Sequence, residues 1–368
     1  MSENNGFPTD LERYHRQMLL PGFGEDGQRR LLNSTVLVVG CGALGTVLAN
    51  TLARAGVGHL KIVDRDFIET TNLQRQILFD ESDVENAIPK AEAARQKIGA
   101  INSGVTVTPV VDDVNHTNVE KLAEGCDVLV DGVDNFETRF LVNDVAVKRG
   151  IPYVYGGAVG TVGMAYSILP HTSSGDTSWE ANGYATPCLR CIFEQTPPPG
   201  MNPTCDTTGV LGPTVSIVAN YQATEAIKIL TGNWDALNRR MLHLDNWENT
   251  FRQLKVEKAY DVSDCTCCQH FSYEFLEGKY ASSTTTLCGR NAVQLTQQVS
   301  EDKLNFDEIA KRLESHGKVD ANKFMLRAEI TDNGEDYELT LFTDGRAIVK
   351  GTQQPNTAKS IYAKYVGV

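Results

Sequence analysis

A glycine-rich loop near the start of the chain could hold phosphate groups. Gly40, Gly42 and Gly45 form the pattern Gly-x-Gly-x-x-Gly after a short apolar run. Such a loop lets backbone N–H groups approach phosphate closely, and the N-terminus of the helix that follows favours anions. Asp64 ends the next apolar run, where a carboxylate can accept hydrogen bonds from ribose hydroxyls. Taken alone, these residues are typical of a dinucleotide-binding protein.

Further polar residues indicate a different ligand. Asn72 and Arg75 lie in one predicted loop, and the Arg75 guanidinium can form a planar fork on phosphate oxygens. Lys90 follows a proline at a predicted helix start, where the helix dipole disfavours a cation. Binding of a triphosphate would explain a lysine at this position, and a solvated lysine is the alternative.

Asp134 follows another apolar run and could hold Mg²⁺, with Asp131 as a rival for this role. A nucleoside triphosphate with a metal needs this many groups directed at phosphate, and a dinucleotide does not.

Two cysteine pairs predict a structural metal site. Cys188 and Cys191 form one C-x-x-C pair, and Cys265 and Cys268 form another. Four thiolates make a closed tetrahedral zinc site, and a redox dithiol would need only one pair. Cys267 lies inside the second pair, but only residues 265 and 268 have the required spacing.

The positions of these residues follow from alternating predicted strands and helices. Apolar runs of strand length occur at 35–39, 59–63, 105–111, 127–131 and from 153 onward. Segments with helical character lie between them, among them 90–101 and 137–149. This alternation predicts an α/β fold with a doubly wound, mostly parallel sheet. Ligands of such sheets bind at the carboxyl ends of the strands.

The second half of the chain has a different texture. A strong helix is predicted from Pro213 to Leu230, with Gly232 just beyond its end. From about residue 304 we expect a helix, three strands near 322–330, 336–342 and 345–350, and a final helix. We therefore expect a domain of residues 1–275 and a small C-terminal α/β module, residues 280–368, whose role the sequence does not indicate.

Composition excludes several classes of protein. The 368 residues carry a net charge of −13 and 41% hydrophobic residues. No basic patch suggests nucleic-acid binding. No apolar run approaches the ~20 residues of a membrane helix, and the N-terminus lacks the apolar core of a signal peptide. We expect a cytoplasmic protein that binds neither nucleic acid nor membrane.

As an ordered set, the motifs resemble those of a known family. The chain resembles the MoeB/ThiF class (HesA/MoeB/ThiF) of adenylyltransferases, relatives of the ubiquitin-activating enzymes. The resemblance rests on residues 13–17, the glycine loop, Asp64, residues 72–76, Pro89-Lys90, residues 132–135, the cysteine pairs and residues 205–209. It implies a Rossmann-like activating-enzyme fold, a homodimer and binding of MgATP. It also implies adenylation of the C-terminal Gly-Gly carboxylate of a ubiquitin-like sulfur carrier of the ThiS/MoaD kind.

The resemblance also implies roles for single residues. Arg16 would reach the phosphates, often those of the neighbouring subunit's site, and Asp134 would serve the metal. Cys205 matches a position where some members carry a thiol that accepts the carrier or relays sulfur, while others do without it. Ala43 departs from the glycine usual in the family, which an ordinary backbone angle would tolerate. The tail resembles a C-terminal extension of some bacterial members and, lacking a Gly-Gly end, is not expected to be a fused carrier.

The remaining cysteines have weaker interpretations. Cys41 and Cys126 lie in apolar surroundings and are expected to pack in the core. Cys288 has no role that the sequence indicates.

Three hypotheses for function remain at this stage. The first is ATP-dependent carrier adenylation for thiamine or molybdenum-cofactor biosynthesis. The second is an NAD-dependent oxidoreductase, which the glycine loop and Asp64 support, although no candidate histidine is placed as a proton donor. The third is an inactive scaffold that binds a ubiquitin-like protein.

Overall fold

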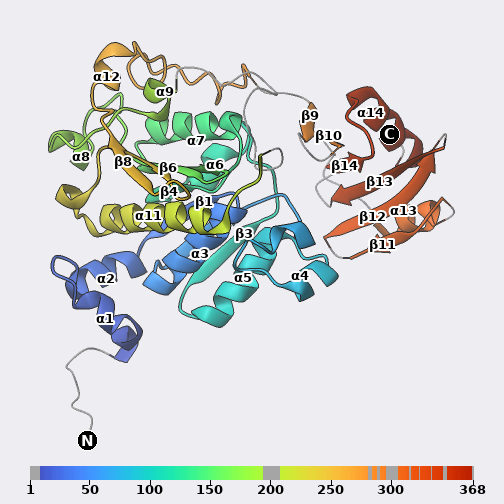
Figure 1. Cartoon of the computed structure of the whole chain (residues 1–368), viewed down its shortest axis with the longest axis horizontal. Helices are drawn as coiled ribbons and strands as arrows, with labels where there is room; N and C mark the ends of the chain where they lie inside the picture. Colours follow the sequence, from blue (N-terminus) through green and yellow to red (C-terminus); the bar gives the residue numbers. More distant parts are fainter. Residues whose placement is uncertain are drawn as a thin grey trace, which may run out of the picture. The chain divides into compact units, whose positions relative to one another are not determined.

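The computed structural model consists of two compact units, Met1–Tyr280 and Ala281–Val368 (Figure 1). It describes residues 9–193, 208–280, 284–287, 291–295, 306–314, 316–322, 324–332, 334–342 and 346–366. Among the described helices, none combines the length and the apolar character that crossing a membrane requires.

The first unit is built on an eight-stranded sheet with the order β3-β2-β1-β4-β5-β6-β7-β8. The neighbours β3, β2, β1, β4 and β5 pair in parallel, and the neighbours β5, β6, β7 and β8 pair antiparallel. The strands are β1 (Thr35–Val39), β2 (His59–Val63), β3 (Thr106–Val110), β4 (Val128–Asp131), β5 (Tyr153–Val159), β6 (Val162–Ile168), β7 (Met241–Asp245) and β8 (Thr250–Leu254).

The central strands β1 and β4 of this sheet are buried on both faces, and helices cover these faces (Figure 1). Along β1, Val36 and Val38 face one apolar cluster, and Leu37 and Val39 face the other, as the two-residue period of a strand requires. The first cluster includes side chains of α3 (Ala43–Ala55), α5 (Lys90–Ile101) and α11 (Gly212–Thr231). The second includes side chains of α6 (Val119–Ala123), α7 (Phe136–Arg149) and α9 (Leu189–Ile192).

Short helical elements complete the first unit. They are η1 (Thr9–Tyr14), α1 (His15–Met18), α2 (Gly24–Leu32), η2 (Thr70–Asn72), α4 (Glu81–Glu85), α8 (Ser178–Ala181), η3 (Trp234–Ala236) and α12 (Ala259–Val262).

The sequence predicted the parallel half of the sheet and missed the antiparallel half. The predicted runs correspond to β1 to β5, and α11 ends at Gly232, whose φ of +75° is the left-handed cap expected of glycine. The strands β6, β7 and β8 were not predicted. The side chains of β8 are exposed or half-buried along its length, because β8 lies at the edge of the sheet. A strand of this kind lacks the apolar run that marks a buried one.

The second unit contains an antiparallel six-stranded sheet with the order β11-β12-β13-β14-β10-β9. Its core contains apolar side chains from both the sheet and the two helices, among them Leu326, Leu339 and Ile361. The strands are β9 (Thr284–Leu287), β10 (Ala292–Leu295), β11 (Val319–Ala321), β12 (Met325–Asp332), β13 (Glu335–Phe342) and β14 (Ala347–Lys350), and the helices are α13 (Phe306–Leu313) and α14 (Pro355–Tyr365).

Three glycines bring the loops after β1 and β4 into contact. A Cβ added to Gly45 would lie 2.0 Å from the carbonyl oxygen of Gly40, and a Cβ added to Gly132 would lie 2.4 Å from the same oxygen. Gly40 itself has a φ of +85°, which other residues rarely adopt. The backbones after β1 and β4 can approach this closely only because none of these residues has a side chain.

We predict that Gly132→Ala destabilises the first unit by about 3 kcal/mol or more, because its methyl group meets fixed backbone atoms. Gly99→Ala is the matched control. Gly99 is exposed on α5 and an added methyl group there meets no atom within 4 Å, so stability should stay equal or rise by about 0.5–1 kcal/mol. Urea unfolding of the full chain measures both. Equal unfolding midpoints for Gly132→Ala and the wild type would contradict this account of the loop contact.

Candidate functional site

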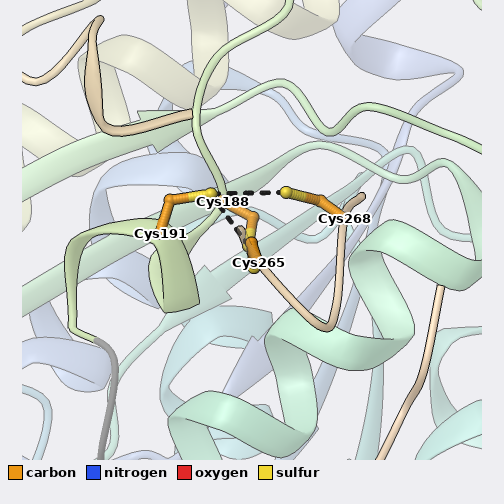
Figure 2. A group of neighbouring side chains, drawn as sticks. All are labelled: Cys188, Cys191, Cys265 and Cys268. Atoms are coloured by element: carbon orange, nitrogen blue, oxygen red, sulfur yellow. Dashed lines mark hydrogen bonds between the residues drawn. The ribbon is translucent and has the colours of Figure 1, made fainter. Parts of the chain in front are cut away.

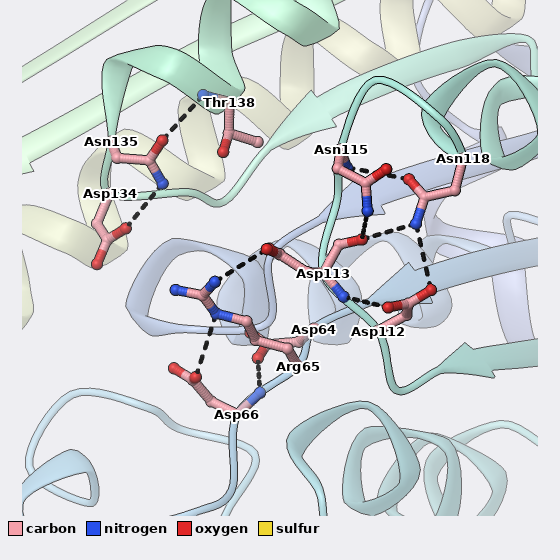
Figure 3. Close-up of polar contacts among 10 residues, drawn as sticks. All are labelled: Asp64, Arg65, Asp66, Asp112, Asp113, Asn115, Asn118, Asp134, Asn135 and Thr138. Carbon is pink, nitrogen blue, oxygen red and sulfur yellow. Dashed lines mark hydrogen bonds and ion pairs between the residues drawn. The ribbon is translucent and has the colours of Figure 1, made fainter. Parts of the chain in front are cut away.

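The candidate nucleotide-binding residues come together at the carboxyl ends of β1, β2 and β4. The glycine loop follows β1, Asp64 follows β2, and Asp134 lies beyond β4. These strands are neighbours in the sheet, so their ends share one edge. Asp64 and Asp134 are drawn together in Figure 3.

Asp64 joins the end of β2 to the glycine loop. Its Oδ2 accepts a hydrogen bond from the Cys41 N–H at 2.6 Å, and its Oδ1 accepts from the Asp66 N–H at 2.7 Å. Burial raises the pKa of Asp64, and the charge of Lys90 opposes that rise. Each carboxylate oxygen has a second lone pair. Asp64 can therefore keep these bonds and still accept from a ribose hydroxyl.

Gly42 differs from the other two glycines of the motif. It is the N-terminal capping residue of α3, with a φ of −84°. The nearest atom to an added Cβ would be the Gly132 carbonyl oxygen at 3.9 Å, which is an ordinary contact. Packing within the protein does not require glycine at this position, and close approach of a ligand to the backbone would. Ala43 begins α3 with an ordinary helical backbone, so the departure from the family pattern is tolerated.

Lys90 is buried and has a partner in the protein. Its Nζ lies 3.0 Å from the Asp66 Oδ2, and its backbone N–H donates to the Asp66 carbonyl oxygen at 2.9 Å. Asp66 thus offsets the cation at the start of α5. The sequence offered a triphosphate or solvent as the explanation for this lysine, and it did not identify Asp66 as a partner. An ammonium group has three donors, so Lys90 can still also donate to a phosphate.

Asn72 and Arg75 are placed by the loop that begins at η2. Asn72 is buried, and its Oδ1 accepts from the Glu69 N–H at 3.1 Å, which closes a capping box. Arg75 is half-buried, and its Nη1 donates to the Thr71 carbonyl oxygen at 2.9 Å. Asn72 therefore shapes the loop, and the Arg75 guanidinium retains donors for a ligand.

Arg16 lies in α1 with an exposed side chain. Within the described part of the chain, this side chain forms no hydrogen bond or ion pair. The structure therefore shows no polar contact between Arg16 and the candidate residues of its own chain that it describes.

The structure distinguishes the two candidate metal carboxylates. Asp131 is buried, and its Oδ2 lies 3.1 Å from the Arg139 Nε and accepts from the Tyr153 hydroxyl at 3.0 Å. Its Oδ1 accepts from the Val133 N–H at 3.0 Å. Asp134 is exposed, and its Oδ1 lies 3.4 Å from the Nδ2 of Asn135 (Figure 3). Asp134 is thus the carboxylate accessible to a metal, and Asp131 belongs to the core.

Arg65 is a charged residue at this edge that the sequence reading missed. Its Nη1 lies 3.1 Å from the Asp113 Oδ2, and its Nε lies 3.8 Å from the Asp66 Oδ1 (Figure 3). Burial disfavours the charged form of the Arg65 guanidinium and so lowers its pKa. The negative charges of Asp113 and Asp66 outweigh this effect, and the pKa of Arg65 is raised. The signal was available, because Asp64-Arg65-Asp66 and Asp113 both follow neighbouring predicted strands.

The two cysteine pairs form one cluster (Figure 2). The Sγ atoms of Cys188, Cys191, Cys265 and Cys268 lie within 4.8 Å of one another, and all four residues are buried. Four convergent thiols at this separation can hold a metal ion such as zinc. The structure thus brings together the four residues that the spacing predicted.

The other cysteines fall into two groups. Cys41 and Cys126 are buried in the two apolar clusters, as expected, and burial raises the pKa of each thiol. Cys267 is fully buried beside the cluster without belonging to it. Cys205 and Cys288 lie outside the described residues.

Comparison with known proteins decides the family. Residues 14–267, more than half of the chain, match the ThiF family. The chain belongs to the ThiF family. Within it, the chain is 38% identical over 356 residues to the sulfur carrier protein ThiS adenylyltransferase of Bacillus subtilis, covering 96% of this chain and 99% of that protein. It is also 40% identical over 257 residues to the SAMP-activating enzyme E1 of Haloferax volcanii, covering 70% of this chain and 89% of that one.

Solved structures agree on the architecture of this ThiF-family chain. Escherichia coli MccB, solved with ATP, superimposes with a TM-score of 0.58 at 22% identity, covering 72% of this chain and 75% of that one. At this identity the likeness shows the fold alone. The sequence-based family resemblance and the α/β fold class are both confirmed. The length of the Bacillus subtilis match means that it extends into the second unit.

We predict that Arg139→Leu destabilises the chain by about 3–5 kcal/mol, because it leaves the buried Asp131 carboxylate without its cation. The control is Arg149→Leu, also on α7, which removes an exposed pair with Glu120 and should change stability by less than about 1 kcal/mol. Denaturant unfolding measures both. Similar losses for the two variants would refute the structural role assigned to Asp131.

Proposed function

We propose that this chain adenylates the C-terminal Gly-Gly carboxylate of a ubiquitin-like sulfur carrier, of the ThiS or MoaD kind, using MgATP. The observation that carries the proposal is the likeness to a named ThiS adenylyltransferase over nearly the full length of both chains. The arrangement of the glycine loop, Asp64 and Asp134 at one sheet edge supports it.

The reaction needs little proton chemistry from the protein. A carboxylate oxygen of the carrier attacks the α-phosphorus of ATP, the bond from that phosphorus to the bridging oxygen breaks, and pyrophosphate leaves with the electron pair. The attacking carboxylate is ionised at neutral pH, so no general base is required. The protein contributes by positioning the reactants and neutralising charge.

The candidate residues have distinct roles in this scheme, and Asn72 acts only by shaping the loop that carries Arg75. The glycine loop and the N-terminus of α3 bind phosphate, and Asp64 accepts from ribose hydroxyls. Arg75 and Lys90 neutralise the phosphate charge. Asp134 would hold Mg²⁺, which would supply positive charge to the phosphates. Cys205 is proposed for a later step, as a thiol that accepts the activated carrier or relays sulfur.

We further propose that the protein works as a homodimer in which Arg16 serves the partner's site. Arg16 is exposed, and Leu19 and Leu20, just after α1, are 62% and 57% exposed. Adjacent apolar side chains at such exposure support a surface that another subunit covers.

We also propose that the four-cysteine cluster binds a structural zinc ion. The cluster has four sulfur donors, all buried, which suits the closed tetrahedral site that zinc forms in proteins. The cluster joins the chain around α9 to the segment that follows α12, and the ion would hold these two distant segments together.

Carrier-dependent exchange of pyrophosphate into ATP is the direct test. We predict exchange with a Gly-Gly carrier and loss of exchange, by about 100-fold or more, in Asp134→Asn and Arg75→Ala, since each removes charge stabilisation in the transition state. Cys205→Ala should retain the wild-type exchange rate, because adenylation precedes the thiol chemistry.

The same assay separates the three hypotheses. A folded chain that binds the carrier without exchange would be a scaffold. A chain that shows no exchange with any ThiS-like or MoaD-like carrier and binds NADH tightly would be an oxidoreductase. Loss of exchange in Cys205→Ala would overturn the proposed order of steps.

For the cysteine cluster we predict about one zinc ion per chain, from the four-ligand count. Cys188→Ser should lose the metal, because the site then has three thiolates. Cys267→Ala is the matched control, since Cys267 is equally buried in the same region but is not one of the four. It should retain the metal. Elemental analysis of folded, gel-filtered protein gives the stoichiometry, and equal zinc content in the two variants would disprove the assignment of ligands.

A further inference from the structure

A buried amide from α7 lies against the cysteine cluster. Asn143 is in the middle of this helix and is fully buried. Asparagine rarely occupies such a position unless its polar atoms have partners, so the contacts of this side chain show why it is there.

The contacts of Asn143 reach the first cysteine pair and Cys267, which lies between the two members of the second pair. Its Oδ1 accepts from the Leu189 N–H at 2.8 Å, and Leu189 is the first residue of α9, between Cys188 and Cys191. Its Nδ2 lies 3.6 Å from the Cys188 Sγ and 3.4 Å from the Cys267 Sγ. The Leu189 N–H can only donate, so the atom facing it must be the amide oxygen. The amide N–H groups therefore face the sulfur atoms.

The next residue of α7 supports the same region from another direction. The Asp144 Oδ2 accepts from the Phe275 N–H at 2.9 Å and from the Leu276 N–H at 3.3 Å. These residues follow the second cysteine pair along the chain. Two consecutive side chains of one helix thus hold the backbone beside the first pair and beyond the second.

We infer that Asn143 is a positioning residue for the metal bound by the four cysteines. Its amide fixes the turn that carries the first pair, and it donates an N–H···S hydrogen bond to the Cys188 sulfur. A donor beside a metal thiolate offsets part of its negative charge and orients it toward the ion, as partners of metal ligands generally do. The contact with Cys267 gives this fifth thiol a structural role without making it a ligand.

The inference rests on the proposed zinc site and concerns retention of the ion rather than catalysis. The test compares the full-length wild type with Asn143→Leu, whose side chain has the same branching and number of heavy atoms but neither donor nor acceptor. Val145→Ala is the control. Val145 is also fully buried on α7, but residues two apart on a helix point in different directions, so this variant perturbs the core without removing the amide.

Two measurements are made on each protein. The first is the rate of zinc release to an excess of a chromogenic chelator. We expect release from Asn143→Leu to be at least about 10-fold faster than from the wild type, and release from Val145→Ala to stay within about 2-fold of it. The second is the thiolate-to-cobalt charge-transfer band of the cobalt-substituted proteins. It should shift to lower energy in Asn143→Leu alone, because a sulfur that has lost its hydrogen bond gives up charge to the metal more easily.

The outcomes separate the inference from the zinc proposal. Wild-type release and an unshifted band in Asn143→Leu would overturn the role of Asn143 while leaving the zinc site intact. Equal acceleration in Asn143→Leu and Val145→Ala, without a band shift, would reduce Asn143 to a packing residue. A wild type that binds neither zinc nor cobalt would overturn both ideas. If Asn143→Leu is insoluble, Asn143→Ala is measured in its place against the same control.

Discussion

The candidate site depends on the contact between two backbones at the centre of the sheet. The carbonyl oxygen of Gly40 occupies the space where side chains at Gly45 and Gly132 would be. This contact draws the loop after β1 against the loop after β4, and Asp134 lies two residues beyond Gly132. Main-chain atoms thus fix where the backbone of the proposed phosphate-binding loop lies relative to the backbone near Asp134, the proposed metal-binding residue.

Charged groups then fix the positions of the loops around this contact. Asp131 and Arg139 pair inside the core and hold the start of α7 to the end of β4. Asp66 pairs with Lys90 and also lies near Arg65, which joins the chain after β2 to the loop after β3 through Asp113. Buried pairs of this kind add little net stability when compared with apolar packing. They fix geometry, which is what charge neutralisation during phosphoryl chemistry requires.

The sequence was informative where one physical cause dominated. Five runs predicted the strands β1 to β5. The apolar residues of β1 and β4 follow from burial on both faces, and the C-x-x-C spacing predicted the cysteine cluster. Prediction failed where the outcome depended on distant partners. Asp131 and Asp134 have the same side chain, and only the position of Arg139 and Tyr153 distinguishes them. The ion pair of Lys90 joins it to Asp66, 24 residues away in the chain, and no sequence pattern indicates this pairing. The edge strand β8 has no apolar run to detect, since most of its side chains face solvent.

The separation of the two cysteine pairs along the chain has a consequence for biosynthesis. Cys188 and Cys265 are 77 residues apart, and β7, β8 and α11 lie between them. At about 5–20 residues per second, the ribosome completes the second pair about 4–15 s after the first. A metal held by all four thiols is therefore acquired only after this interval, when the last strand of the large sheet has been made. During it, the first pair is a dithiol without its two partners. With the proposed zinc ion, the large domain would therefore reach its final state late, and its assembly would depend on the supply of metal.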